Sequence, residues 1–251
     1  LEKTYFSKYS SRRIFKHIFS YIPMKKVIVL SLGGSVIIPD KIDFTFLDRF
    51  KKTLQKHYKE WKFVIVCGGG AIARRYIEAL HKEGASERAI SEAGMRATRM
   101  NAMFLIQFFG KEVNAHLPKD MHEVKHNLGK NSVVICGALR YASDETSDGT
   151  AAKLAHFLGT SFVNITNVDG LYTKDPTSHK DAKFIPYESW NDFEKRVRKM
   201  KFKPGQHFVL DQQAASIIRE YKIKTTIVGK DLTNLDRYLL QKPFKGTTLG
   251  L

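Results

Sequence analysis

The sequence has few cysteines and no long apolar segment. Two of its 251 residues are cysteine, which is too few for a disulfide framework. Cys67 and Cys136 each end an apolar run, so we expect both to be buried, reduced thiols in a cytoplasmic protein. No apolar run approaches the ~20 residues that a membrane-spanning helix needs. We therefore expect neither a disulfide-stapled secreted domain nor a membrane span.

Two common nucleotide-binding motifs are also missing. The chain contains neither G-x-x-x-x-G-K-[ST] nor G-x-G-x-x-G. This absence disfavours a P-loop ATPase, a Rossmann dehydrogenase and a protein kinase.

Acidic residues are scarce relative to basic ones. The chain has 25 Asp and Glu against 42 Lys and Arg, a formal net charge of +17. Such a surplus favours anionic partners: nucleotides, nucleic acid or an acidic surface. The densest run of cations, Lys195–Lys203, contains one aromatic residue, Phe202, so base stacking and nucleic-acid binding are poorly supported. We expect a solvated face there, with a cation reaching nucleotide phosphates as the alternative.

Residues 1–23 are predicted to be a basic extension that precedes a single domain over residues 24–251. Apolar residues recur in it at helical spacing between cations: Ile14, Phe15, Ile18, Phe19 and Ile22. Such a segment is typical of a membrane-surface helix or a targeting peptide. The alternative is sequence upstream of a start at Met24, because the domain needs nothing before that residue.

The domain itself alternates short apolar runs with helix-length segments. The predicted strands are Val27–Leu32, Phe63–Cys67, Val133–Cys136, Phe162–Ile165 and Thr225–Val228. Continuous apolar runs indicate strands buried on both faces, and their alternation with helices indicates parallel pairing. The fold class is therefore α/β, a three-layer α/β/α sandwich with a mainly parallel central sheet. Predicted helices are Ala71–Glu83, ending at Gly84, Gly149–Leu158, ending at Gly159, and Thr98–Phe109, which is apolar nearly all round and expected to be buried.

Glycine-rich loops follow two of the predicted strands. They read Gly33-Gly34-Ser35 and Gly68-Gly69-Gly70. Glycine lets the backbone approach a phosphate, and exposed N–H groups with a helix N-terminus favour negative charge. Arg74 lies one turn into the helix after the second loop, where its guanidinium is suited to clamp a phosphate. We interpret the pair of loops as a phosphate site rather than as two tight turns.

The second half of the domain contributes two polar segments. Thr146, Ser147 and Asp148 precede a helix, either as its cap or as a cluster of hydroxyls and a carboxylate that orients a substrate. The strand Phe162–Ile165 runs into T-N-V-D-G-L-Y-T-K-D-P, which alone signals only a turn.

The order of these motifs resembles the amino acid kinase superfamily, and most closely its archaeal type of uridylate (UMP) kinase. The resemblance covers residues 26–249, with I-T-N-V-D-G-L-Y-T-K-D-P and G-G-G-A-I-A-R-R-Y as its most specific parts. It implies transfer of the ATP γ-phosphoryl group to UMP, giving UDP for pyrimidine nucleotide synthesis. It also implies Mg²⁺ held mainly through nucleotide phosphates without protein metal ligands, an acceptor-binding half over about 24–140, an ATP-binding half over about 141–251, and a hexamer built from dimers.

The resemblance also implies roles for individual residues. The catalytic group would be Gly33, Gly34, Arg74 and Asp148. The ATP-binding group would be Gly33, Gly34, Ser35, Gly70, Arg74, Thr166, Tyr172 and Asp175. The UMP-binding group would be Gly69, Ser91, Gly137, Ala138 and Thr146, with the stretch Gly137–Thr146 recognising uridine.

The chain departs from the family pattern at three places. Ser31 stands where many members have a lysine, Ser91 where an aspartate contacts the acceptor, with Glu92 beside it, and the loop before Asp148 is about two residues longer. These departures leave two alternatives open: another kinase of the superfamily, such as an isopentenyl phosphate kinase, or a non-catalytic nucleotide-binding protein. Isopentenyl phosphate kinases carry a histidine after the glycine triplet, whereas this chain has Arg74 and Arg75, which favours UMP.

Overall fold

The computed structural model describes residues 25–139, 146–199 and 209–250. Within them, a seven-stranded sheet has the order β3-β2-β1-β4-β8-β9-β7. All neighbours pair in parallel except β8 and β9, which are antiparallel. The strands are β1 (Lys26–Leu32), β2 (Trp61–Cys67), β3 (Val133–Cys136), β4 (Phe162–Ile165), β7 (Tyr187–Glu188), β8 (Thr225–Val228) and β9 (Thr247–Leu249). The predicted α/β sandwich with a mainly parallel sheet is confirmed.

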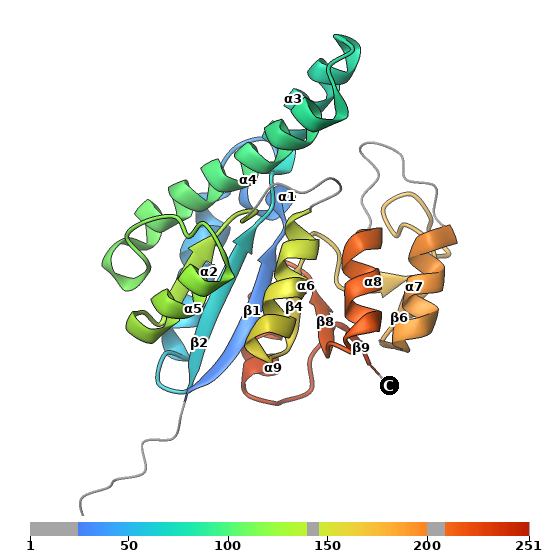
Figure 1. Ribbon diagram of the computed structural model, residues 1–251. Helices are drawn as coiled ribbons and strands as arrows, with labels where there is room; N and C mark the ends of the chain where they lie inside the picture. The colour runs from blue at the N-terminus through green and yellow to red at the C-terminus, as the bar shows by residue number, and fades with distance from the viewer. Residues whose placement is uncertain (1–24, 140–145, 200–208, 251) are drawn as a thin grey trace, which may run out of the picture.

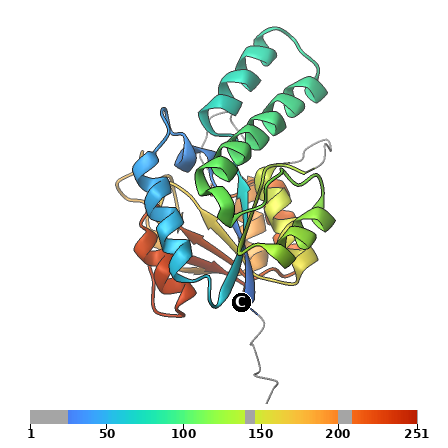
Figure 2. The same ribbon diagram turned by 90° about the vertical axis from the view of Figure 1, so that its left-hand side faces the viewer.

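Helices cover both faces of this sheet (Figures 1 and 2). One face carries α1 (Gly34–Ile37), α2 (Phe44–Lys56), α4 (Glu87–Phe109) and α9 (Leu232–Leu239), and the other carries α5 (Met121–Lys130), α6 (Ser147–Leu158), α7 (Trp190–Lys199) and α8 (Gln212–Glu220). The helix α3 (Gly70–Lys82) pairs with α4 in a hairpin that projects beyond the carboxyl edge of the sheet (Figure 1). A short 3₁₀ helix (Gly110–Glu112) follows α4, and β5 (Leu171–Tyr172) and β6 (Phe184–Ile185) form a separate antiparallel pair.

The strands form because both of their faces are buried. Ile28, Leu30 and Leu32 of β1 join the core under α2 and α4, whereas Val29 joins the core under α6 and α8. Ser31 points to the second face and is fully buried. Because successive side chains of a strand point to opposite faces of the sheet, one apolar run contributes to two separate cores.

Helix ends follow local chemistry. Gly84 and Gly159 both adopt left-handed backbone conformations (φ +67° and +62°), as expected for glycines that close helices. Thr146 caps α6 by accepting a hydrogen bond from the backbone nitrogen of Gly149 (2.9 Å). The helices predicted over Ala71–Glu83 and Gly149–Leu158 are therefore confirmed, the second beginning two residues earlier.

One helix prediction was wrong in its burial. Residues 98–109 form the C-terminal half of α4, but Met100 and Met103 are each 57% exposed. Only one side of α4 meets the sheet, so an all-round apolar composition here includes an exposed face. Cys67 and Cys136 are buried as predicted.

Some predicted features lie outside the described residues: the extension over residues 1–23, part of the loop before Asp148, and the end of the basic run beyond Lys199. In the described part of the chain, no helix is long and apolar enough to cross a membrane.

Candidate functional site

The two glycine loops interlock at the carboxyl edge of the sheet. A β-carbon added to Gly70 would lie 2.6 Å from the carbonyl oxygen of Gly34, and one added to Gly68 would lie 2.5 Å from the Gly34 nitrogen. Gly70 also has a left-handed backbone (φ +65°). Because β1 and β2 are parallel neighbours, their loops emerge side by side. Glycine is therefore required for the close approach of the two loops, and the α3 N-terminus adds backbone donors there.

Asn101 of α4 holds the second glycine loop through hydrogen bonds. Its side chain is 1% exposed and its Nδ2 donates to the carbonyl oxygens of Gly68 (2.7 Å) and Gly69 (3.2 Å). This turns the two carbonyls toward α4 and holds the loop in place. Sequence reasoning missed Asn101, although an amide inside the apolar stretch Thr98–Phe109 was a usable signal.

Thr98 of α4 contacts or lies beside three of the predicted acceptor residues: Gly69, Gly137 and Ala138. Its Oγ1 accepts a hydrogen bond from the Ala138 nitrogen (2.9 Å). A β-carbon on Gly69 would lie 3.6 Å from the Thr98 Cγ2, and one on Gly137 would lie 2.7 Å from its carbonyl carbon. Ser91 lies two turns earlier on the same face of α4 and is half-buried. Thr98 itself was not predicted.

Three arginines and one glutamate of α4 lie near this group. The Nη1 of Arg99 donates to the carbonyl oxygens of Ala138 (3.3 Å) and Leu139 (3.4 Å), which anchors the start of the loop after β3. Glu92, beside Ser91, pairs along the helix with Arg88 and Arg96 (3.1 Å each). Its carboxylate is therefore engaged on the α4 surface.

Arg74 lies one turn into α3, as predicted. Its side chain is exposed, and among the described residues its guanidinium forms no ion pair. A long cation beside the interlocked loops is thus available to an anion.

A second group of polar side chains, which includes Ser31, Asp148 and Asn164, lies near the carboxyl ends of β1 and β4. The Ser31 hydroxyl, at the end of β1, donates to the Asp148 Oδ1 in the first turn of α6 (2.7 Å). Asn164, which is in register with Ser31, donates through Nδ2 to the carbonyl oxygen of Val209. Two residues on, Asp211 caps α8 by accepting from the Ala214 nitrogen (2.8 Å). The Ser31–Asp148 bond was not predicted.

Burial raises the pKa of Asp148 to about 7. The negative charge of Asp211 adds to this rise, and the hydrogen bond from Ser31 opposes it. Asp148 is thus a carboxyl whose charge changes near neutral pH, as is common at functional sites.

Thr146 lies beside this polar group. Its backbone nitrogen and hydroxyl both donate to the Gln213 Oε1 of α8, at 3.3 and 3.4 Å. Its described contacts are therefore with α6 and α8, and none of them is with the group gathered around Thr98.

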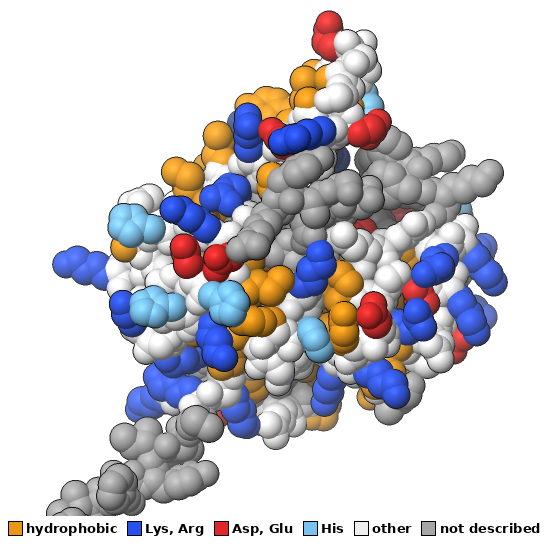
Figure 3. All heavy atoms as spheres, viewed as in Figure 1, with side chains coloured by type: hydrophobic (Ala, Val, Ile, Leu, Met, Phe, Trp, Pro, Cys, Tyr) orange, Lys and Arg blue, Asp and Glu red, His pale blue; other side chains and the backbone are white. Residues whose placement is uncertain are grey.

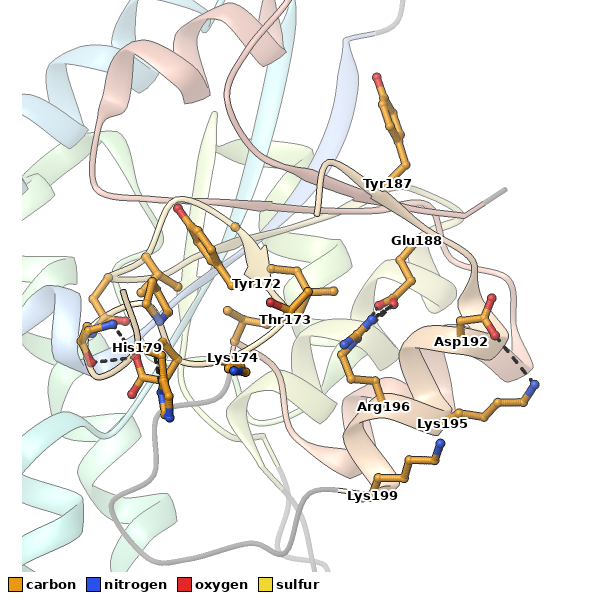
Figure 4. Close-up of a pocket in the computed structure, with 18 of the residues that line it drawn as sticks. Tyr172, Thr173, Lys174, His179, Tyr187, Glu188, Asp192, Lys195, Arg196 and Lys199 are labelled. Carbon is orange, nitrogen blue, oxygen red and sulfur yellow. Dashed lines mark hydrogen bonds and ion pairs between the residues drawn. The ribbon is translucent and has the colours of Figure 1, made fainter. Parts of the chain in front are cut away.

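A cavity of about 900 Å³ opens in the second half of the chain. The loops around β5 and the residues of β7 and α7 line it (Figure 4). Tyr172 and Asp175 contribute to its wall, as the ATP prediction requires, whereas Thr166 does not. The volume is within the range of a small-molecule site.

Cations line the α7 side of this cavity. Arg196 is held by two nitrogens against the Glu188 carboxylate (Nε–Oε1 3.0 Å and Nη2–Oε1 2.5 Å), and Lys195 lies 3.7 Å from Asp192. Lys199 belongs to the same wall. This half of the basic run is thus a wall of the cavity rather than solely a solvated face.

Asp175 organises the loop after β5, which forms another part of the cavity wall. Its carboxylate accepts from the nitrogen and hydroxyl of Thr177 (2.9 and 2.7 Å), and these bonds lower the pKa of Asp175. The carboxylate therefore stays ionised and fixes the loop after β5.

Comparisons with known proteins give one consistent result. A model of the amino acid kinase family matches residues 26–229. The uridylate kinase of Pyrococcus abyssi is 37% identical over 204 residues, which cover 81% of this chain and 90% of that protein. The uridylate kinase of Thermoplasma volcanium is 35% identical over 227 residues, covering 90% of this chain and 98% of that protein.

Solved structures agree with the sequence comparison. The crystal structure of uridylate kinase from Archaeoglobus fulgidus has a TM-score of 0.77 at 33% identity, covering 89% of this chain and 99% of the other. The UMP kinase of Ureaplasma parvum, at 22% identity, has a TM-score of 0.74, covers 91% of this chain and 100% of the other, and shares the fold.

Proposed function

The chain belongs to the amino acid kinase family, and from this premise we propose that it is a uridylate kinase. The reaction transfers the γ-phosphoryl group of ATP to UMP and gives UDP and ADP, supplying pyrimidine nucleotide synthesis. The observation that carries the proposal is the pair of interlocked glycine loops, which lie between the group around Thr98 and the polar group around Asp148. A site of this kind has an acceptor on one side and a donor on the other.

The acceptor belongs to the half of the domain over residues 24–140. We assign the UMP phosphate to Gly69 and the uridine to Ser91, Gly137, Ala138 and Thr146. Gly69, Gly137 and Ala138 are held against α4 through Thr98, which supports this assignment. Thr146, the most distant member, would meet the nucleotide from the α6 side.

The donor belongs to the half over residues 141–251. We assign the ATP nucleoside to the cavity lined by Tyr172 and Asp175, and Thr166 to its edge. Gly33, Gly34, Ser35, Gly70 and Arg74 would surround the phosphates. Phosphoryl transfer depends on positioning and charge stabilisation more than on covalent chemistry. Backbone N–H groups of the loops and the Arg74 guanidinium supply both.

Magnesium fits this site as a companion of the nucleotide. In kinase sites Mg²⁺ keeps several waters and is bound largely through substrate phosphates, whose charge it neutralises. In the described residues, no group of three or more His, Cys, Asp and Glu side chains is arranged to hold a metal. We propose that the chain's part is to orient the phosphates, with Asp148 ordering the groups around them.

Cations for the transferring group come from two places. Ser31 supplies none where many family members have a lysine, so Arg74 is the first candidate. Lys195 and Lys199 of the cavity wall are the second. This arrangement supports the interpretation of the basic run as part of a phosphate site.

We also propose assembly through the exposed face of α4. Hydrophobic side chains gather along the edge of the molecule where this helix runs (Figure 3). Met100 and Met103 are exposed there, and Phe44, 65% exposed, joins the same surface through edge contact with Phe108 (ring centroids 5.7 Å apart). An apolar face of this kind is suited to a second copy across a two-fold axis, and dimers of this type would build a hexamer in the cytoplasm.

The test is an assay of ADP release with ATP and Mg²⁺, run in parallel with UMP, CMP, AMP, GMP and isopentenyl phosphate. The Asp148→Asn variant, purified identically, controls for contaminating host kinases. Turnover confined to UMP is the expected result. Turnover with another acceptor would replace the acceptor assignment, and ATP binding without any turnover would assign a non-catalytic nucleotide-binding role.

A further inference from the structure

Ser31 is the side chain of β1 that reaches the polar group at the carboxyl edge. It is fully buried, and its hydroxyl donates to the Asp148 Oδ1 at 2.7 Å. The bond joins residues 117 positions apart in the chain, between an interior strand of the sheet and the first turn of α6. It therefore ties the orientation of the carboxylate to the buried strand β1.

Hydrogen bonds also hold Asn164 and Asp211, two polar residues near this bond. Asn164 lies beside Ser31 in the parallel register of β1 and β4 and is 2% exposed. Through its bond to the Val209 carbonyl it holds the chain two residues before Asp211. Asp211 is itself fixed as the cap of α8. Asp148 thus interacts with the charge of a capping residue, Asp211, and with the hydroxyl of a buried residue, Ser31.

We propose that Ser31 is a positioning residue for phosphoryl transfer, because its hydroxyl holds the Asp148 carboxylate in the orientation and the charge state that the site uses. The inference rests on the proposed kinase function. A hydroxyl that donates to a carboxylate stabilises its ionised form, whereas burial and a neighbouring carboxylate favour its protonated form. Ser31 thus opposes the two effects that raise the pKa of Asp148.

Among the described residues of the other elements packed around α6, few charges besides Asp211 act on Asp148. Asp211 of α8 is the one whose charge raises the Asp148 pKa. β4 has no charged residue, and α5 contacts the far end of α6 at Phe157, about 13 Å along the helix. The remaining charged residues of β1, β2 and α8 lie at the amino ends of the strands or at the end of the helix: Lys26, Lys62, Arg219 and Glu220.

The test is the pH dependence of kcat/KM for UMP in the wild type and Ser31→Ala. Loss of the hydroxyl should move the acid limb upward by about one pH unit, so that the rate at pH 6 falls about tenfold more than the rate at pH 9. Thr226→Val is the matched control. Thr226 is also fully buried in the sheet, and within the described residues its Oγ1 has no hydrogen-bond partner, so the limb should stay in place.

A double-mutant cycle with Asp148→Asn completes the experiment, and it is measured as the midpoint of thermal unfolding at several pH values because the Asn variant is expected to be inactive. If Ser31 acts through Asp148, the effect of Ser31→Ala on the pH dependence of that midpoint should disappear when Asp148 is already Asn. Ser31→Thr keeps the hydroxyl, so its acid limb should lie where the wild-type limb lies. This variant remains informative if Ser31→Ala folds poorly. A rate lowered by one factor at every pH, or additive effects in the cycle, would overturn the proposal. A wild type without UMP turnover at any pH would instead overturn the proposed function.

Discussion

Gly34 and Gly70 approach so closely that a β-carbon on Gly34 would lie 1.9 Å from the backbone nitrogen of Gly70. The two residues belong to loops that follow different strands, and neither loop has room for a side chain at the contact. The surface they form together is therefore backbone, with its N–H groups available to an anion. This contact makes the site sensitive to the smallest substitution.

Gly34→Ala should abolish turnover and lower the melting temperature, because the added methyl must displace the backbone of the second loop. We expect a loss of at least 100-fold in kcat/KM, measured by ADP release, together with a lower midpoint of thermal unfolding. Gly129→Ala on α5 is the control. A β-carbon there meets nothing within 4 Å, so this variant should keep full activity and gain up to about 1 kcal/mol of stability. Equal activity in the two variants would contradict the interlocked arrangement.

Asn101→Ala should release the second loop without unfolding the protein. The carbonyls of Gly68 and Gly69 lose their buried donor, which costs about 1–3 kcal/mol of stability. We expect kcat/KM for UMP to fall roughly 10- to 100-fold, because misplacement of about 1 Å has effects of this size. Asn127→Ala, which deletes one surface bond to the Glu123 carbonyl, should leave the rate unchanged. An Asn101 variant with lowered stability and wild-type kinetics would show that the loop holds its position unaided.

Arg74 and Arg75 offer a comparison between adjacent cations. Both are exposed, but successive residues of a helix point about 100° apart, so they do not address the same space. Arg74→Ala should lower kcat by about 10²- to 10³-fold, the usual effect of removing one donor to the transition state. Arg75→Ala should change it little. Equal losses in steady-state assays would indicate a general electrostatic effect rather than a phosphate contact.

Asp148→Asn should be more stable than the wild type at high pH while being inactive. The pKa of Asp148 is raised to about 7 in the folded protein, so between about pH 4 and pH 7 the folded chain holds a proton that the unfolded chain has lost. Wild-type stability therefore falls as pH rises through this window, and the Asn variant escapes that loss. Melting temperatures at pH 5 and pH 8 should show an advantage for the variant that is larger at pH 8.

For Asp175 we expect the opposite pH dependence of stability. Its pKa is lowered in the folded protein by bonds from Thr177, so its charge stabilises the fold above the unfolded pKa, and this stabilisation is lost as pH falls. The Asp175 variant should therefore be less stable than the wild type at pH 8. The Asp148 prediction has its own contradicting outcome. A difference in melting temperature between the wild type and Asp148→Asn that does not change with pH would mean that the Asp148 carboxyl titrates normally.

The sequence was sufficient for the features that depend on neighbouring residues. Continuous apolar runs predicted five strands to within two residues, because a strand buried on both faces leaves little choice of composition. Gly84 and Gly159 marked helix ends through a backbone conformation that favours glycine. The beginning of α4 was not predicted, since residues 87–97 have little apolar periodicity and are supported by packing against α3.

The same distinction between local and long-range features applies to the candidate site. The glycine loops were found because glycine is needed where two backbones meet. The bonds that position them were not, because they join residues far apart in the chain: Asn101 and Gly68 are 33 positions apart, and Ser31 and Asp148 are 117. Ser31 was noted as a missing lysine, and its hydroxyl bond became visible only when β1 and α6 were placed together.

Substitutions on α4 should change the assembly state without changing the fold. A two-fold interface brings the same residue of both copies together, so Met100→Lys with Met103→Lys would place like charges against each other on an apolar surface. We expect light scattering after size exclusion to show a smaller mass than for the wild type, with an unchanged circular dichroism spectrum. Leu240→Lys is the control, because Leu240 is a 45% exposed leucine at the end of a different helix, α9. A mass unaffected by the α4 pair, or equally reduced by Leu240→Lys, would remove α4 as the interface.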